Sequence, residues 1–202
     1  MAHRQELKTV AMIAGHFGFA AMVKARERTA PLWALMLATV WLDIVFIPLL
    51  LMQVESVQPV RTHPGYGSLI IHADLTHSLL GMLVLSAALG IAFLPGWGRR
   101  TAIVVGLVAA SHWLLDLLVH RPDMPILPEN FGHLPRLGLG LWTHPQLSAC
   151  LELVLVLAGS LFYGRAALDV SRQAGQSSKW PVISASLIAL FGLLVLYLDY
   201  TA

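Results

Sequence analysis

Long apolar runs separated by short polar stretches dominate the chain. Five runs are long enough to cross about 30 Å of hydrocarbon at about 1.5 Å of helix rise per residue. They cover residues 31–53, 74–95, 101–119, 145–164 and 181–198. A sixth run, residues 9–23, makes only about four helical turns and either spans thinly or re-enters the bilayer.

The same pattern argues against strands. No segment alternates apolar and polar residues with a period of two, and lipid does not tolerate open sheet edges. We therefore expect an all-α fold: a polytopic transmembrane bundle of five to six helices in one domain, residues 1–202, with Asp74 as an expected N-cap. Two long loops, residues 54–73 and 120–144, lie on one side and form either lids or a packed cap.

Composition supports a membrane location. The chain is 57% hydrophobic and 12% charged, and the charged share is roughly half that of a typical soluble domain. These values exclude a soluble globule, a disordered chain and a disulfide scaffold. The net charge is +2 and the basic residues are scattered, so a nucleic acid is not an expected partner. The expected partners are membrane lipid and, as a further possibility, another membrane protein.

The basic residues predict an orientation. If all six runs cross, the larger set falls on one side: Lys24, Arg26, Arg28, Arg99, Arg100, Arg165, Arg172 and Lys179. The other side receives Arg4, Lys8, Arg61, Arg121 and Arg136. The positive-inside rule then places the two long loops outside the cytoplasm.

Ionisable residues inside the apolar runs indicate a site. A carboxylate at membrane depth costs on the order of 3 kcal/mol, so it normally faces a partner or an aqueous cavity. Counted along their helices, six such residues fall within roughly 10 Å of one another in depth, near the end that carries the long loops. They are His16, Asp43, His77, His112, Asp116 and Glu152.

The residue types favour a metal. His112, Asp116 and His120 repeat at every fourth position and share one helix face. Imidazole with carboxylate suits a divalent transition metal, and the absence of clustered cysteines argues against an iron–sulfur cluster. Zinc is the ion we expect first. Six candidate ligands exceed the four of tetrahedral zinc, so the site holds two ions, or one ion with further carboxylates orienting its histidines.

Four pieces of the chain carry a family resemblance: Gly15-His16, Leu42-Asp43, Leu75-Thr76-His77-Ser78 and Ser111-His112-Trp113-Leu114-Leu115-Asp116. On these pieces the chain resembles the bacterial membrane-bound metal-dependent hydrolases, a family that includes LexA-binding inner-membrane hydrolases. The chain departs from the family pattern after Asp43, where Ile44 and Val45 replace an acidic residue or histidine. The resemblance implies a multi-pass protein of the bacterial inner membrane with a metal site at His16, Asp43, His77, His112 and Asp116.

The first functional hypothesis is a membrane-embedded metal-dependent hydrolase of a lipid-linked or head-group-proximal ester or phosphoester. Glu152 would act as ligand or general base beside the metal-bound Asp116. Arg121 and Arg136 would bind a substrate phosphate, and His72 and His120 would orient the ligands. Two alternatives remain open: an ion, proton or metal transporter, and a non-catalytic subunit of a membrane complex that binds haem or metal.

Overall fold

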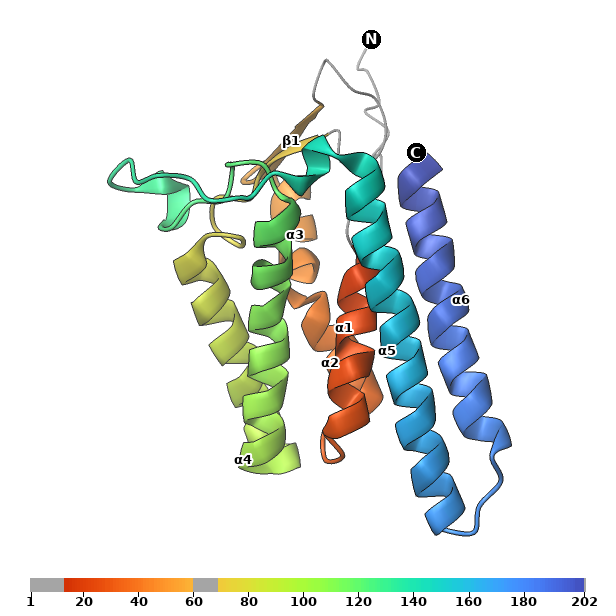
Figure 1. Ribbon diagram of the computed structural model, residues 1–202. Helices are drawn as coiled ribbons and strands as arrows, with labels where there is room; N and C mark the ends of the chain where they lie inside the picture. The colour runs from red at the N-terminus through yellow and green to blue at the C-terminus, as the bar shows by residue number, and fades with distance from the viewer. Residues whose placement is uncertain (1–12, 60–68, 202) are drawn as a thin grey trace.

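The computed structural model describes residues 13–59 and 69–201. These contain six α-helices, two 3₁₀ helices and one strand pair. In chain order the elements are α1 (Ile13–Arg26), α2 (Leu32–Thr39), α3 (Trp41–Leu51), β1 (Ser56–Pro59), β2 (Leu69–His72), α4 (Leu79–Val119), η1 (Pro128–Asn130), η2 (Leu141–Thr143), α5 (Pro145–Gln173) and α6 (Lys179–Thr201). The predicted helical character is therefore confirmed, with a small sheet added (Figure 1).

Three of the described helices, α4, α5 and α6, are long and apolar enough to cross a membrane. The bent pair of α2 and α3 would provide a fourth span if it crosses as one unit. The described part of α1 has 14 residues, and the start of the predicted run 9–23 lies outside the described residues, as do Arg4, Lys8 and Arg61. The chain thus has the helices of a membrane protein.

The predicted run over residues 31–53 forms two helices rather than one, because the helix breaks at Val40. There the backbone leaves helical geometry (φ −116°, ψ 15°), and the axes of α2 and α3 meet at 46°. Thr39, just before the break, donates its hydroxyl to the His16 carbonyl, while its own carbonyl accepts a bond from His112 Nδ1. The break therefore turns a backbone carbonyl toward the interior of the bundle.

Helix α4 is a hairpin of two antiparallel halves, residues 79–97 and 99–119. The chain reverses at Gly98, whose φ of 75° is unfavourable for a residue with a side chain. A Cβ on Gly90 would lie 2.8 Å from the Ala102 carbonyl oxygen, so the halves touch backbone to backbone. The helix begins at Leu79 and is capped by Ser78, whose Oγ accepts from the Gly81 amide at 2.9 Å. The expectation that Asp74 caps it is therefore wrong.

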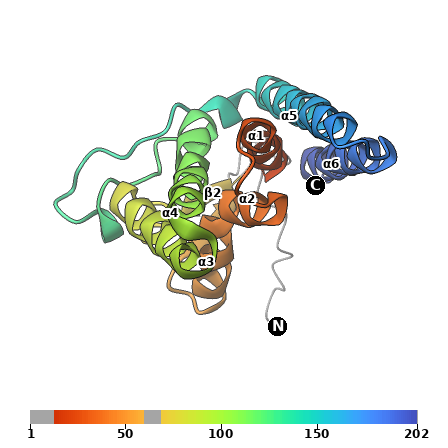
Figure 2. The ribbon, with the colours of Figure 1, turned by 90° about the horizontal axis from the view of Figure 1, so that it is seen from below.

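Helix α1 lies between α2 and the α5–α6 pair (Figure 2). Its closest neighbour is α5: a Cβ on Gly18 would collide with the Leu155 backbone, and one on Gly159 with the Gly18 backbone. Small residues at such crossings let membrane helices pack closely without cavities. This contact fixes the depth of α1 relative to the rest of the bundle.

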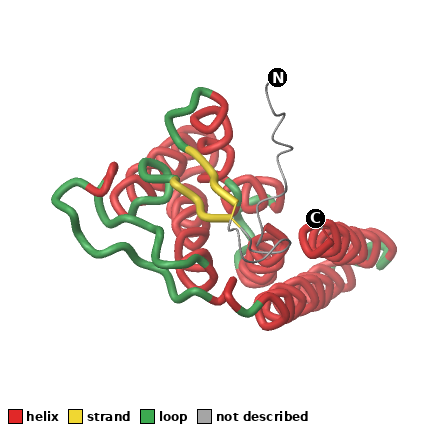
Figure 3. The backbone as a smooth tube through the Cα atoms, turned by 90° about the horizontal axis from the view of Figure 1, so that it is seen from above, coloured by secondary structure: helices red, strands yellow, loops and turns green. Residues whose placement is uncertain are grey.

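The strand pair and the segment after α4 cover one end of the bundle (Figure 3). β1 and β2 are antiparallel, with Ser56 opposite His72. The segment 120–144 is attached to this pair, because Asp123 Oδ2 accepts from the Ile71 amide and Arg121 donates to the Leu69 carbonyl. We call the strand pair and segment 120–144 the cap.

Candidate metal centre

The structure brings the five predicted ligands to one small cavity beneath the cap. His16 lies in α1, Asp43 in the first turn of α3, His77 in the turn before α4, and His112 and Asp116 in the second half of α4. The break at Val40 sets Asp43 in the first turn of a new helix. Its carboxylate therefore reaches the cavity from α3, whereas the other ligands come from α1, α4 and the turn before α4. No two elements alone would form this site.

Two overlapping groups of three donor atoms have the mutual spacing of ligands around an ion: Asp43, His77 and His112, and His16, His112 and Asp116. His77 Nε2 lies 3.3 Å from His112 Nε2, and Asp43 Oδ1 lies 3.5 and 3.6 Å from these two nitrogens. Asp116 Oδ2 lies 3.0 Å from His112 Nε2 and 3.6 Å from His77 Nε2. Tetrahedral ligands at about 2.0–2.1 Å from zinc stand roughly 3.3 Å apart. Asp43, His77 and His112 therefore offer three ligands at the spacing of a tetrahedral ion, and Asp116 lies beside both histidines.

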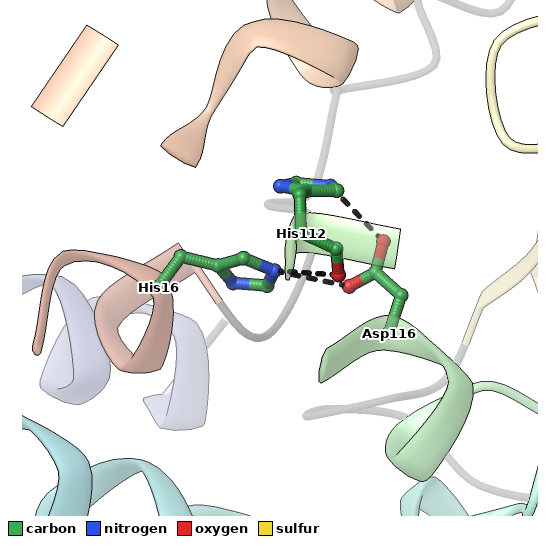
Figure 4. A group of neighbouring side chains, drawn as sticks. All are labelled: His16, His112 and Asp116. Atoms are coloured by element: carbon green, nitrogen blue, oxygen red, sulfur yellow. Dashed lines mark hydrogen bonds and ion pairs between the residues drawn. The ribbon is translucent and has the colours of Figure 1, made fainter. Parts of the chain in front are cut away.

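The second oxygen of Asp116 faces the fifth ligand. His16 Nε2 lies 3.4 Å from Asp116 Oδ1, and the His16 and His112 rings stand 4.1 Å apart (Figure 4). His16, His112 and Asp116 form a group compatible with a metal ion, which shares His112 with the group of Asp43, His77 and His112. Asp116 thus lies between His16 and the pair of His77 and His112, and His16 Nε2 also lies 3.3 Å from the His112 carbonyl oxygen.

Hydrogen bonds behind the histidines prepare them as ligands. His112 Nδ1 lies 2.7 Å from the Thr39 carbonyl and His120 Nδ1 lies 2.9 Å from Asp123 Oδ1. Since a carbonyl and a carboxylate only accept, each Nδ1 carries the proton. The Nε2 atoms, which face the cavity, are left with lone pairs.

His77 is also protonated at Nδ1, through a relay of hydrogen bonds from His77 to Thr76 and from Thr76 to Glu55. Thr76 Oγ1 lies 3.1 and 3.0 Å from the two Glu55 oxygens and donates its single proton to that carboxylate. The hydroxyl can then only accept from His77 Nδ1, 2.8 Å away. Glu55 is held in turn by the Leu75 and Thr76 amides, each at 2.9 Å. Carboxylate, hydroxyl and imidazole are therefore aligned toward the cavity.

Burial and charge both favour a cation. The side chains of His16, His112 and Asp116 are no more than 6% exposed and that of Asp43 is 18% exposed. Of the described residues that line the cavity, none is Lys or Arg, although two are carboxylates. Buried carboxylates require a positive partner. The cavity of about 10 Å³ is about the size that one water occupies by this measure, which suits an ion.

The remaining predicted residues lie in other places. His120 lines the cavity, with Nε2 4.0 Å from Asp116 Oδ2, whereas His72 does not line it and its Nε2 is buried without a hydrogen bond among the described residues. Glu152 is fully buried, but its Oε2 accepts from the Gly15 amide at 2.9 Å and it is not a lining residue.

The two arginines belong to the cap and not to the cavity. Arg136 forms a two-pronged pair with Asp74 at 2.8 and 2.9 Å and also donates to the Asp123 carbonyl at 2.7 Å. The hydrogen bonds to Asp74 raise the pKa of Arg136. Arg121 donates to the Leu69 carbonyl. The arginines therefore hold the cap together in this structure.

Sequence reasoning missed the residues behind the ligands. Glu55 lies 21 positions before Thr76, in a stretch with no recognisable motif, and no spacing rule links them. Thr39 acts through its backbone carbonyl, which every residue possesses. Thr76 belongs to the Thr-His-Ser piece, and its position beside His77 is the one signal in the sequence that points to it.

A haem does not fit between His77 and His112. Axial ligands on opposite faces of a haem iron have nitrogens about 4 Å apart with the macrocycle between them, whereas these nitrogens are 3.3 Å apart. The small cavity has no volume for a porphyrin. The haem form of the subunit hypothesis is therefore disfavoured by geometry.

Comparisons of the chain with family models, curated proteins and solved structures return no match. The resemblance to membrane-bound metal-dependent hydrolases remains a prediction from the four sequence pieces. The function of the protein is therefore inferred from the geometry of the site.

Proposed function

We propose that the protein is a membrane-embedded metal-dependent hydrolase, with a divalent transition ion, zinc first, at Asp43, His77, His112 and Asp116. The supporting observation is the two groups of three donor atoms at ligand spacing, which share His112, with the tautomers of His77 and His112 set by groups behind them. A second ion would share Asp116 with His16 through Oδ1. We also propose that the bundle lies in a bacterial inner membrane with the cap outside the cytoplasm.

The chemistry follows from the residues present. A divalent ion in such a site supplies Lewis acidity that activates water for attack near neutral pH. His120 is the best-positioned base, because its Nε2 faces the cavity and its Nδ1 is held by Asp123 at 2.9 Å. The Asp123 carboxylate stabilises the imidazolium that forms when His120 takes a proton. This assignment moves the predicted base from Glu152 to His120.

The substrate class follows from position. The site lies under a cap at one end of apolar helices, where a lipid-linked ester or phosphoester would present its polar group. The cavity is too small for any such group in addition to an ion. The cap must therefore move for substrate to reach the ion, and release of Arg136 from Asp74 would make it available to a phosphate.

Metal analysis tests whether the site binds a metal ion. Protein purified in detergent without chelator should carry about one or two equivalents of a transition metal by inductively coupled plasma mass spectrometry. His112→Ala and Asp116→Ala should reduce this to near zero, whereas His133→Asn, an exposed loop histidine, should retain it. A wild-type protein free of transition metal after purification and zinc dialysis would refute the metal site.

Turnover of probe substrates tests whether the metal-loaded protein is a hydrolase. With bis-p-nitrophenyl phosphate and p-nitrophenyl butyrate as probes, metal-loaded wild type should hydrolyse at least one. His120→Gln should keep its metal and lose about 100-fold or more in kcat, in the range of general-base catalysis. Metal-loaded protein that hydrolyses neither probe, but moves zinc or protons across proteoliposomes, would favour the transport alternative.

A further inference from the structure

A second cavity lies at the opposite end of α1 from the metal centre. Its volume is about 590 Å³, and it opens between the last turn of α1 and the α5–α6 hairpin. Helix α5 continues to Gln173, well beyond the predicted end at residue 164, and α6 already begins at Lys179. The hairpin therefore extends past the end of α1 (Figure 1), and the cavity occupies the corner between them.

The lining of this cavity is basic. Lys24 and Arg28 contribute two cations, and none of the described residues that line it is acidic. Two acids adjoin lining residues in sequence. Glu27 accepts from the Thr29 hydroxyl at 2.6 Å and from the Arg100 guanidinium at 3.0 Å, and Asp169 is exposed and does not line the cavity. The charges that line the cavity are therefore positive.

The side chains around the opening include cations, hydrogen-bonding groups and an exposed tryptophan. Lys24 Nζ is held over the end of α1 by the Arg28 and Ala30 carbonyls at 3.2 and 2.8 Å, while the Arg28 side chain is exposed. Tyr163 and Gln176 add hydrogen-bonding groups, and Trp180, which is 72% exposed, borders the opening. Trp at the level of the head groups is typical of membrane interfaces.

The cavity also has an apolar part. Ala166, Ala167 and Val170 line it along one face of α5. The outer surfaces of the hairpin are apolar and exposed, for example Phe162 at 45% and Val182 at 51%. A molecule bound here would have its charged part beside Lys24 and Arg28 and its apolar part against α5 and the surrounding lipid.

We propose that this cavity binds the phosphate head group of an anionic phospholipid. A phosphate satisfies the two cations together, and basic pockets between membrane helices bind such head groups. The apolar wall along α5 selects a lipid over a free phosphate. The proposal is independent of the metal centre, because it uses no residue of that site.

Native mass spectrometry of the detergent-purified full chain, titrated with phosphatidylglycerol or phosphatidylcholine, tests the proposal. We expect phosphatidylglycerol to bind at least about tenfold more tightly than phosphatidylcholine. The double variant Lys24→Gln/Arg28→Gln should lose about ten- to thirtyfold in phosphatidylglycerol affinity, as expected for two basic residues near a membrane surface. The single variant Arg28→Gln should lose a smaller factor without affecting the helix end that Lys24 holds.

The matched control removes the same charge at other positions. Arg99 and Arg165 are exposed and do not line the cavity, so Arg99→Gln/Arg165→Gln should bind phosphatidylglycerol like wild type. Equal binding of the two lipids by wild type would overturn the proposal, as would equal losses in the two double variants. Displacement of bound phosphatidylglycerol by millimolar inorganic phosphate would overturn the lipid assignment and indicate a site for a free anion.

Discussion

The two ends of α1 use charge in opposite ways. Near its start, His16 joins a closed cavity with two carboxylates, no Lys or Arg among the described lining residues, and room for about one water. Near its end, Lys24 joins an open cavity of about 590 Å³ with two cations and no acid among the described lining residues. The first end therefore suits a small cation held on all sides, and the second suits a large anion that remains partly in lipid.

The two sites also differ in how firmly their side chains are held. At the candidate metal centre the Nδ1 atoms of His77, His112 and His120 each contact a protein acceptor, which fixes the orientation of these three rings. At the basic end, the exposed Arg28 side chain can follow its ligand. We expect metal binding at the first end to be sensitive to small changes in ligand position, and anion binding at the second end to tolerate them.

The largest expected effect comes from removing metal. A ligand at about 1,000 times its Kd stabilises the folded state by about 4 kcal/mol, which corresponds to roughly 8–16 °C in melting temperature for a chain of this size. Treatment with a chelator should lower the melting temperature by this order, and added zinc should restore it. Lys24→Gln/Arg28→Gln should show the same chelator shift. An unchanged melting temperature in wild type would show that the metal end is not a metal site.

The next effect concerns the relay behind His77. Thr76→Val removes the hydroxyl that lies between His77 and Glu55, and loss of such an outer partner costs about 10- to 100-fold in metal affinity. Competition with a zinc-binding dye measures it. Thr76→Ser should retain most of the affinity, and Thr101→Val, another buried threonine outside the site, should not change it. Equal affinity in Thr76→Val would show that the relay does not support metal binding.

A smaller effect should come from the cap. Arg136→Gln breaks the two-pronged pair with Asp74, whose side chains are 29% and 26% exposed. Partly exposed pairs of this kind contribute about 1 kcal/mol. Thermal melting should show a shift of a few degrees, and zinc should leave the protein faster when excess chelator is added. A variant that releases zinc at the wild-type rate would show that the cap does not control access.

The last effect concerns acid at the basic end. Hydrogen bonds from the Thr29 hydroxyl and amide, supported by Arg100, lower the pKa of Glu27 to about 2. Because the folded-state pKa is depressed, the stabilisation is complete above the unfolded pKa of about 4.3 and is lost as pH falls toward 2. The difference in stability between wild type and Glu27→Gln should therefore be constant from pH 7 to about 5.5 and shrink below that.

The same acid titration shows whether the two ends of α1 respond to pH independently. Metal ligands must be deprotonated, so acid releases zinc from the metal end while the Glu27 contact is still intact. Zinc content measured across the same pH range should fall first. A Glu27→Gln difference that disappears together with the zinc would show that the two ends are coupled.

The features that the sequence predicted best are those that depend only on position along a helix. The apolar runs predicted the helical bundle, and counting residues placed His16, Asp43, His77, His112 and Asp116 at one depth, where the structure brings them to one cavity. Glu152 has the same depth and still lies apart from the cavity lining, bonded to Gly15. Depth follows from the rise per residue, whereas the direction of a side chain around its helix depends on how the helices are rotated against one another.

The sequence by itself determined that this chain has helices long and apolar enough to span a membrane, and which His and Asp residues fall within its apolar runs, because hydropathy and helix rise are local quantities. Only the tertiary structure decided the break at Val40, the Glu55–Thr76–His77 relay and the role of His120 beside Asp123. Those features depend on contacts between residues as far apart as Thr39 and His112. The tautomers of His77, His112 and His120 follow from such contacts and not from spacing.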